Sequence, residues 1–427
     1  MQSTDIRKLE QDHPEYIRQV EKNYWWNFIV IMLDSAFFTF SVTVLSQDTI
    51  IPYFVAQLTD QKFFIGLVPA LYFLGYYLPQ LLGAHLVTGR TTRKRYIFWI
   101  AVAERFGILL IALLVQTLDW FTPGQTLALL MVAFTLYSIT TGLIGPAYSD
   151  FISKHIIRRR GVFFGAMNGL GGLIGFFASL TATYLLNRYA YPINLRWLLW
   201  IGFATSFISP FFIVAYRETP FPFKVKREPL GEFLRSIPSF IRSAPGFGRY
   251  MTVRALLNLG VMANAFYALY AIDRFHLDEG VLGIMTMVIL IAQSLIGFLW
   301  GWLGDRYGFK LVYIIASLMV VLMGVLSLTA PGLWAFYAIA LCMGGLYAVA
   351  RTADPNMVFE FAPPSETSRF VGIANTFVAP VVTLAPLIGG VIVDHLSHAV
   401  LFATVLVVGV LSLLLVLFYL PSARQKG

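Results

Sequence analysis

The sequence has little charge, one cysteine and six histidines, and each shortage excludes a class of protein. Charged residues make up 12% of the 427 residues, against roughly 25% in soluble domains, which excludes an ordinary water-facing surface. The lone cysteine, Cys342, lies in an apolar run and excludes a disulfide framework. The sequence also shows no Cys/His cluster, phosphate-cradling loop or nucleophile–base set. We therefore expect no enzyme activity, no cofactor and no metal site.

Long apolar runs are what the sequence has in abundance, and hydrophobic residues reach 58%. A spanning helix needs about 20 such residues to cross the hydrocarbon core. The runs that meet this length are 28–50, 64–87, 97–118, 126–148, 163–186, 197–215, 250–271, 280–300, 310–330, 333–352, 370–393 and 398–420. They predict an all-α integral membrane protein with twelve transmembrane helices in two six-helix bundles.

The positive charges fix the expected orientation. With the N-terminus inside, 24 of the 31 Lys and Arg residues fall in inner segments and 4 in outer loops, while Arg105, Arg254 and Arg351 lie inside spans. This bias follows the positive-inside rule. It predicts a multi-pass protein of the cell (plasma or inner) membrane with both termini cytoplasmic. The net charge of +9 comes mostly from this bias, so we expect contacts with anionic lipid rather than nucleic acid.

A repeat divides the chain into two halves. Gly165 and Asn168 open the fifth span, and Gly372 and Asn375, each 207 residues later, open the eleventh. The predicted domains are a cytoplasmic arm (1–25), a six-helix bundle (26–216), a cytoplasmic central loop (217–249), a second six-helix bundle (250–420) and a cytoplasmic tail (421–427). We expect the arm to be either a short amphipathic helix on the inner surface or a partly ordered tail, and the segment 230–242 to be a surface-lying helix.

A motif after the eighth span points to a family. The run Gly301-Trp-Leu-Gly304-Asp305-Arg306-Tyr-Gly308-Phe-Lys310 resembles the loop signature G-x-x-x-D-R-x-G-x-K of the major facilitator superfamily. The resemblance implies a monomeric secondary transporter that moves a small-molecule substrate by alternating access. It also implies that Asp305, Arg306 and Lys310 latch one access state. The alternative is a plain turn in which Gly304 and Gly308 supply unusual dihedrals.

Polar side chains inside spans are the candidates for coupling and substrate contact, because an ionisable residue at a helix centre costs about 2.5–3.5 kcal/mol. These candidates are Asp34, Gln47, Asp48, Glu104, Arg105, Arg254, Asn258, Asn264, Tyr267 and Tyr270. Asp34 is expected either to carry a proton or to pair with Arg105 or an inner-loop lysine. Asp48 is the second candidate for coupling a proton, with Gln47 beside it.

Other charged pairs are predicted to hold the inner face together. Arg351 and Asp354 are three residues apart, so on a regular helix they share a face and are expected to pair. Asp150 has a similar predicted role beside Lys154. The adjacent Glu104 and Arg105 point about 100° apart on a helix and are expected to reach different neighbours.

Three functional alternatives remain open at this point. An import carrier predicts a cavity where Asn, Gln and charged groups converge, whereas an exporter of drugs or other amphipathic compounds predicts an apolar, aromatic cavity. A transporter-like sensor of the same fold predicts saturable binding without flux.

Overall fold

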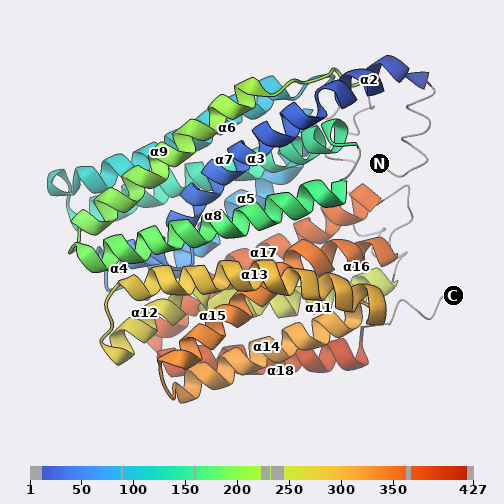
Figure 1. Ribbon diagram of the computed structural model, residues 1–427. Coiled ribbons are helices and arrows are strands. Elements are labelled where there is room, and N and C mark those ends of the chain that lie inside the picture. The colour runs from blue at the N-terminus through green and yellow to red at the C-terminus, as the bar shows by residue number, and fades with distance from the viewer. Residues whose placement is uncertain are drawn as a thin grey trace.

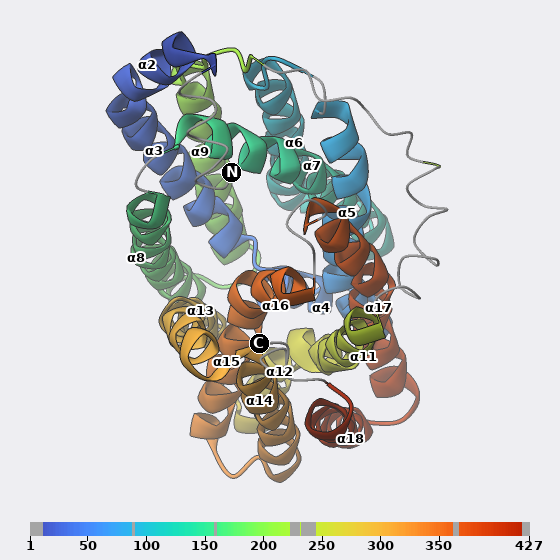
Figure 2. The ribbon, with the colours of Figure 1, turned by 90° about the vertical axis from the view of Figure 1, so that its right-hand side faces the viewer.

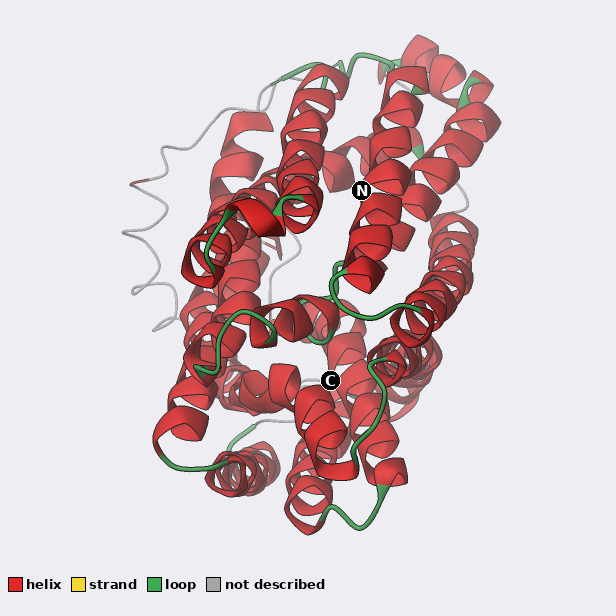
Figure 3. Cartoon of the chain, turned by 90° about the vertical axis from the view of Figure 1, so that its left-hand side faces the viewer, coloured by secondary structure: helices red, strands yellow, loops and turns green. Residues whose placement is uncertain are grey.

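The computed structural model describes residues 12–87, 90–157, 160–222, 231, 245–361 and 367–420. The regular structure of these residues is entirely helical (Figure 3). Twelve helices are long and apolar enough to cross a membrane, which confirms the predicted all-α class and the number of spans. The helix predicted at 230–242 lies, apart from Gly231, outside the described residues.

The first six spans are single helices. They are α3 (Tyr24–Val44), α5 (Lys62–Val87), α6 (Lys94–Gln116), α7 (Pro123–His155), α8 (Arg160–Arg188) and α9 (Ile193–Ala215), with the short α4 (Ile50–Ala56) after α3. The last six spans include two that are interrupted. They are α11–η2–α12 (Pro245–Leu259, Gly260–Ala263, Asn264–Phe275), α13 (Gly280–Tyr307), α14 (Phe309–Thr329), α15–η3–α16 (Leu333–Ala348, Val349–Ala353, Asp354–Phe361), α17 (Thr367–His395) and α18 (His398–Phe418).

The spans form two groups that follow the order of the chain. Helices α3 to α9, blue to green, lie together on one side, and helices α11 to α18, yellow to red, lie on the other (Figures 1 and 2). Helix α3 begins and α18 ends at the same end of the bundle, which we call the near end; the opposite end is the far end (Figure 1).

The two halves meet along two helix pairs, α5 with α17 and α8 with α13. Glycine residues allow the two helices of each pair to pack closely. A Cβ atom on Gly66 would lie 2.1 Å from the carbonyl oxygen of Pro386, and one on Gly283 would lie 2.3 Å from Oγ1 of Thr183. Small residues let helix backbones approach closely inside a membrane, so these glycines set the register of the interface between the halves.

One interruption contains a candidate site residue, Arg351. The turn η3 (Val349–Ala353) is a single π-helical turn between α15 and α16. Such turns insert an extra residue into a helix and are frequent at functional sites. Here the insertion changes the direction in which Arg351 points relative to the residues that follow it.

The arm before the first span contains the helix α2 (Pro14–Lys22). Its apolar residues Tyr16, Ile17 and Val20 are buried in a small cluster with Ile157, against which Phe221 also packs. The amphipathic face predicted to rest on the membrane surface therefore packs on the protein.

Candidate functional site

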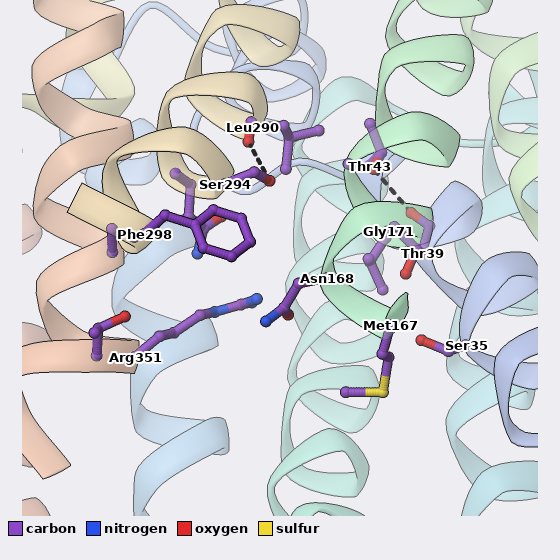
Figure 4. Close-up of a pocket in the computed structure, with 16 residues that line it drawn as sticks. Ser35, Thr39, Thr43, Met167, Asn168, Gly171, Leu290, Ser294, Phe298 and Arg351 are labelled. Atoms are coloured by element: carbon purple, nitrogen blue, oxygen red, sulfur yellow. Dashed lines mark hydrogen bonds between the residues drawn. The ribbon is translucent and has the colours of Figure 1, made fainter. Parts of the chain in front are cut away.

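A cavity of about 400 Å³ lies between the two halves. Helices α3, α5 and α7 line it from the first half, and α13, α15 and η3 line it from the second. A second cavity of about 300 Å³ adjoins it, bounded by α3, α8, α13 and η3 (Figure 4). The residues common to both are Val42, Thr43, Leu290, Gln293 and Arg351. The two spaces therefore adjoin, and together we call them the central cavity.

The central cavity is accessible from the near side and sealed toward the far end. Asn168 and Arg351 are exposed, whereas Asp48, Thr49 and Thr286 are 4%, 1% and 6% exposed. A solute in this conformation can reach Arg351 before it reaches Asp48.

Contacts between the halves close the far end. The carboxylate of Asp394 in α17 accepts hydrogen bonds from the backbone amides of Lys62 (2.5 Å) and Phe63 (2.6 Å) at the start of α5. The hydroxyls of Thr49 and Thr286 lie 2.6 Å apart across the interface. A carboxylate at a helix N-terminus satisfies amides that have no partner within the helix, so Asp394 caps α5 from the opposite half.

Asp48 lies at the sealed end of the cavity. Its Oδ2 accepts hydrogen bonds from the Tyr347 hydroxyl (2.8 Å) and from Nε2 of Gln47 (3.2 Å). Its buried Oδ1 has no partner within the described chain. Asn264 donates to the Tyr347 hydroxyl at 3.0 Å. The predicted candidates Gln47, Asp48 and Asn264 are thus brought together, with Tyr347 as the link between them.

Arg351 does not pair with Asp354, and that prediction is wrong. The π turn places the two side chains on different faces, because three residues turn through a smaller angle there than in an α-helix. Arg351 instead lines both parts of the cavity and extends toward Asn168 of α8 (Figure 4). No hydrogen bond or ion pair joins Arg351 to another described residue.

Asp354 pairs with Arg254 of α11 instead. Nε of Arg254 lies 2.5 Å from Oδ2 of Asp354, and both side chains are buried. Nη2 of Arg254 donates to Asn375 at 3.1 Å, and the Tyr313 hydroxyl donates to Asp354. This network joins four spans of the second half, and Arg254 lines neither part of the central cavity. Asn258, another candidate, donates to the Arg254 carbonyl at 2.8 Å within its own helix.

Asp34 has an equivalent place in the first half. It accepts hydrogen bonds from Tyr148 at 2.9 Å and from Ser209 and Tyr216. Nη2 of Arg105 donates to the same Ser209 hydroxyl at 2.8 Å. Asp34 lines neither part of the central cavity. Of the two sequence interpretations, this arrangement favours a structural partner of Arg105, reached through Ser209.

Glu104 and Arg105 are in direct contact, because their long side chains bend back toward each other. Each also reaches a separate neighbour, as expected: Glu104 accepts from Thr141 at 2.6 Å, and Nε of Arg105 donates to the Ser206 carbonyl at 3.3 Å. Both residues are buried within the first half.

Tyr267 and Tyr270 pack away from the cavity. Tyr267 stacks on Phe402 with ring centroids 5.5 Å apart, and Tyr270 meets the same ring edge-on at 5.1 Å. Both tyrosines therefore pack α12 against α18, and their predicted contact with substrate has no geometric support.

Sequence reasoning missed several cavity residues, above all Asn168, Gln293 and Tyr347. One signal was present in the sequence: Ser35, Thr39 and Thr43 are four residues apart and line the cavity as one face of α3 (Figure 4). Single amides scattered among apolar residues give no comparable pattern.

The near end of the first half carries a polar cluster. Asp150 accepts from Nε of Arg93 (2.6 Å) and from Nζ of Lys154 (2.8 Å), so it joins the start of α6 to the end of α7. Glu218 accepts the backbone amides of Arg93 (2.6 Å) and Lys94 (3.0 Å). Burial raises the pKa of Glu218 and lowers that of His155 to about 4.

A family model described as Major Facilitator Superfamily matches residues 251–427, which contain the whole second half of the cavity. The fold of both halves agrees with that match. Residues 251–427 are thus similar in sequence to the major facilitator superfamily, and the whole chain shares the fold of its solved members. This partial sequence match and this fold are those of secondary transporters. None of the curated proteins matches the sequence.

Solved structures of the superfamily share the fold at low identity. A mutant of the nucleoside transporter NupG has a TM-score of 0.73 and 14% identity, covering 91% of this chain and 98% of its own. A D-xylose–proton symporter has a TM-score of 0.68 and 14% identity, with 94% and 99% covered. The xylose transporter XylE from E. coli, in a partially occluded inward-open conformation, has a TM-score of 0.65 and 14% identity, with 95% and 100% covered.

The superfamily loop lies at the near end of α13 and α14. Gly308 has a φ of 89°, a left-handed conformation that favours glycine. Gly304 has a different role from the predicted one: it is helical, and a Cβ there would lie 2.2 Å from the Phe309 ring. Arg306 lies over the Tyr307 ring, and Nζ of Lys310 donates to the Leu417 carbonyl at 3.1 Å. The latch role of Asp305, Arg306 and Lys310 stays a prediction.

Proposed function

We propose that this transporter carries a small polar organic solute together with a proton, and that Asp48 carries the proton. The position of Asp48 supports this most directly. It is a buried carboxylate that lines the solute cavity at its sealed end. One of its oxygens has two donors, and the other has none among the described residues.

A proton carrier must meet the solute path, and Asp48 does so whereas Asp34 does not. An ionised carboxylate with an unpaired oxygen is costly in a buried site, and protonation removes that charge. The ionisable groups that line this part of the cavity with Asp48 are Tyr72, Tyr76, Tyr77, Tyr137, Tyr347 and Arg351. Arg351 is the only cation among these lining groups, so a proton on Asp48 changes the charge balance of the cavity.

We further propose that the near end faces the cytoplasm, because 24 of the 31 Lys and Arg residues then fall on that side. The conformation described above is then open to the cytoplasm and closed outside by the α5–α17 contacts. The two halves rock about the central cavity to alternate access. A D-xylose–proton symporter with a similar fold supports this proposal.

The lining supports a polar solute over an amphipathic drug. Asp48, Asn168, Gln293 and Arg351 converge on the cavity from both halves, together with the hydroxyl face of α3. A largely apolar chamber would have favoured export of amphipathic compounds. Direction of transport follows from the proton gradient if solute and proton move together, which gives uptake into the cytoplasm.

The test is solute-driven proton movement in proteoliposomes that contain a pH-sensitive dye. Monosaccharides, nucleosides, dipeptides and organic anions are added in turn to the wild type and to Asp48→Asn. We expect one class to acidify the lumen with the wild type, and Asp48→Asn to bind that solute but move no protons. The matched control is Asp60→Asn, a far-end carboxylate that is exposed and should leave coupling unchanged.

Two results would count against the proposal. If the Asp48→Asn variant still showed solute-dependent proton flux, a residue other than Asp48 would carry the proton. Binding of a solute by the purified wild type with no flux of that solute in liposomes would identify a transporter-like sensor.

A further inference from the structure

We propose that Arg351 and Asn168 bind the negatively charged group of the transported solute, so that the substrate is an organic anion. This inference rests on the proposed function only in taking the bound solute as the one transported. Binding can be measured without transport, so the two proposals can fail separately.

The argument begins with the three arginines inside spans. Arg105 contacts Glu104, Ser206 and Ser209, and Arg254 contacts Asp354 and Asn375. Both of these guanidinium groups are therefore satisfied by the protein. Arg351 has no hydrogen bond or ion pair to any other described residue and lines the cavity instead. An ionisable group at membrane depth is costly and by default marks a functional site, and of the three only Arg351 is available for a ligand.

The surroundings of Arg351 suit an oxyanion. Asn168 of α8 points toward it from the opposite half (Figure 4), and its amide nitrogen is a donor. The hydroxyls of Ser35 and Thr39 line the same part of the cavity. A guanidinium fork binds carboxylate and phosphate oxygens through two parallel hydrogen bonds, with geometric specificity that a lysine lacks. Carboxylate and phosphate share this chemistry, and the experiment below distinguishes them.

The rest of the cavity suits the remainder of a small molecule. It extends over about 400 Å³ from Arg351 to Asp48. Tyr72, Tyr76 and Tyr77 of α5 also line it. With the anion at Arg351 and a proton on Asp48, the loaded cavity carries no net charge from these two groups. This neutrality lowers the cost of occluding the solute inside the membrane.

The position of the site also links binding to the transport cycle. Arg351 belongs to the second half and Asn168 to the first, so an anion held by both bridges the halves on the open side of the cavity. Bridging draws the near ends together, which is the movement needed to close the cytoplasmic side.

The experiment measures binding to the purified full-length protein in detergent, by thermal unfolding and by calorimetric titration. The probes are pairs of an acid and a neutral counterpart: benzoate and benzamide, lactate and lactamide, glycerol phosphate and glycerol. Phenylalanine is added as a zwitterion. We expect at least one acid to raise the unfolding temperature, with its neutral partner inert. The acid that binds distinguishes carboxylate from phosphate recognition.

The variants test the residues themselves. Arg351→Gln should weaken binding of that acid about 10- to 100-fold, because hydrogen bonds to charged groups are worth roughly 1.5–3 kcal/mol. Arg351→Lys should keep part of the affinity, and Asn168→Ala should lose a smaller part. Arg274→Gln, which removes an exposed far-end charge, should bind as the wild type does.

Folding of the key variant can be checked directly. Without ligand, Arg351→Gln should unfold at the wild-type temperature or above it, because no described protein contact is lost.

Four results would each overturn the inference. They are equal binding of an acid and its amide, unchanged affinity in Arg351→Gln, binding of phenylalanine alone, and no response to any acid. None of these results would by itself contradict a proton-coupled transporter of a neutral or zwitterionic solute.

Discussion

Arg254 and Asp354, 100 residues apart in the chain, form a buried ion pair at 2.5 Å between α11 and α16. Asn375 and Tyr313 complete the hydrogen bonding of this pair. The pair therefore holds the near end of the second half as one unit, which is what a half must be if it is to rock as a rigid body.

Breaking this pair should strongly destabilise the protein. Removing one partner leaves an uncompensated buried charge, so Arg254→Gln should lower the free energy of unfolding by about 3–5 kcal/mol. The measurement is denaturant unfolding in detergent. Replacing both partners, as in Arg254→Met with Asp354→Leu, should recover most of the loss. Arg196→Gln is the control, because the Arg196–Asp119 pair is long (3.4 Å), with Asp119 exposed and Arg196 partly exposed; its cost should be about 0–1 kcal/mol.

Removing the far-end cap should open the far side. Asp394→Ala leaves the amides of Lys62 and Phe63 without the acceptor that joins the halves. A lost cap costs about 0.5–2 kcal/mol, which shifts the equilibrium between conformations about 2- to 30-fold.

The shift can be measured by labelling. A single cysteine at Ser46, which lines the cavity, in a Cys342→Ala background should react faster with an impermeant maleimide applied from the far side. Asp273→Ala, an exposed carboxylate of α12, serves as the control. Equal labelling of the Asp394 variant and the parent would show that the cap does not hold the far end shut.

Gly66→Ala should act on the same interface by steric clash. The new Cβ would lie 2.1 Å from the Pro386 carbonyl oxygen, so α5 and α17 must separate. Overpacking of this kind costs about 1–3 kcal/mol, seen as a lower unfolding temperature together with faster far-side labelling. Gly124→Ala has no atom within 4 Å of the new Cβ and should change the free energy of unfolding by less than about 0.5 kcal/mol.

His155 should make stability depend on pH. It lies beyond the membrane-spanning part of α7, and burial lowers its pKa from 6.5 to about 4. The unfolded chain therefore binds this proton more readily than the folded protein does. The stabilisation that depends on a neutral His155 is therefore fully present above pH 6.5 and is lost as the pH falls toward 4. The loss in free energy of unfolding is on the order of 3 kcal/mol.

The comparison of His155→Gln with the wild type between pH 7.5 and 4.5 isolates this effect. Burial raises the pKa of the neighbouring Glu218, which acts in the opposite sense but is common to both proteins. The stability difference between the two should shrink as the pH falls. A difference that stays constant across this range would show that His155 does not titrate as described.

The spans were predictable because twenty apolar residues in a row have few alternatives in a membrane. The pairing of charged side chains was not predictable, because it depends on where each helix deviates from regular geometry. The prediction of an Arg351–Asp354 pair assumed a regular α-helix. With one π turn at this position, Arg351 lines the cavity and Asp354 pairs with Arg254. Nothing in the sequence marks that turn.

The residues of the candidate site show the same limit. Asp48 was identified because a carboxylate is conspicuous inside a span, and Gln47 because it is adjacent. Asn168 had been noticed only as part of the repeat, and its place opposite Arg351 depends on how the two halves meet. Contacts across the interface between halves have no local signal in a single sequence.

The N-terminal arm offers a position at which the motion of the first half can be followed. Because α2 is buried against Ile157 and Phe221, it belongs to the first half and must travel with it. A fluorophore placed on the exposed side of α2 and a second at the end of α18 would therefore report the separation of the two halves. Their energy transfer would record each opening and closing without any change to the residues that line the central cavity.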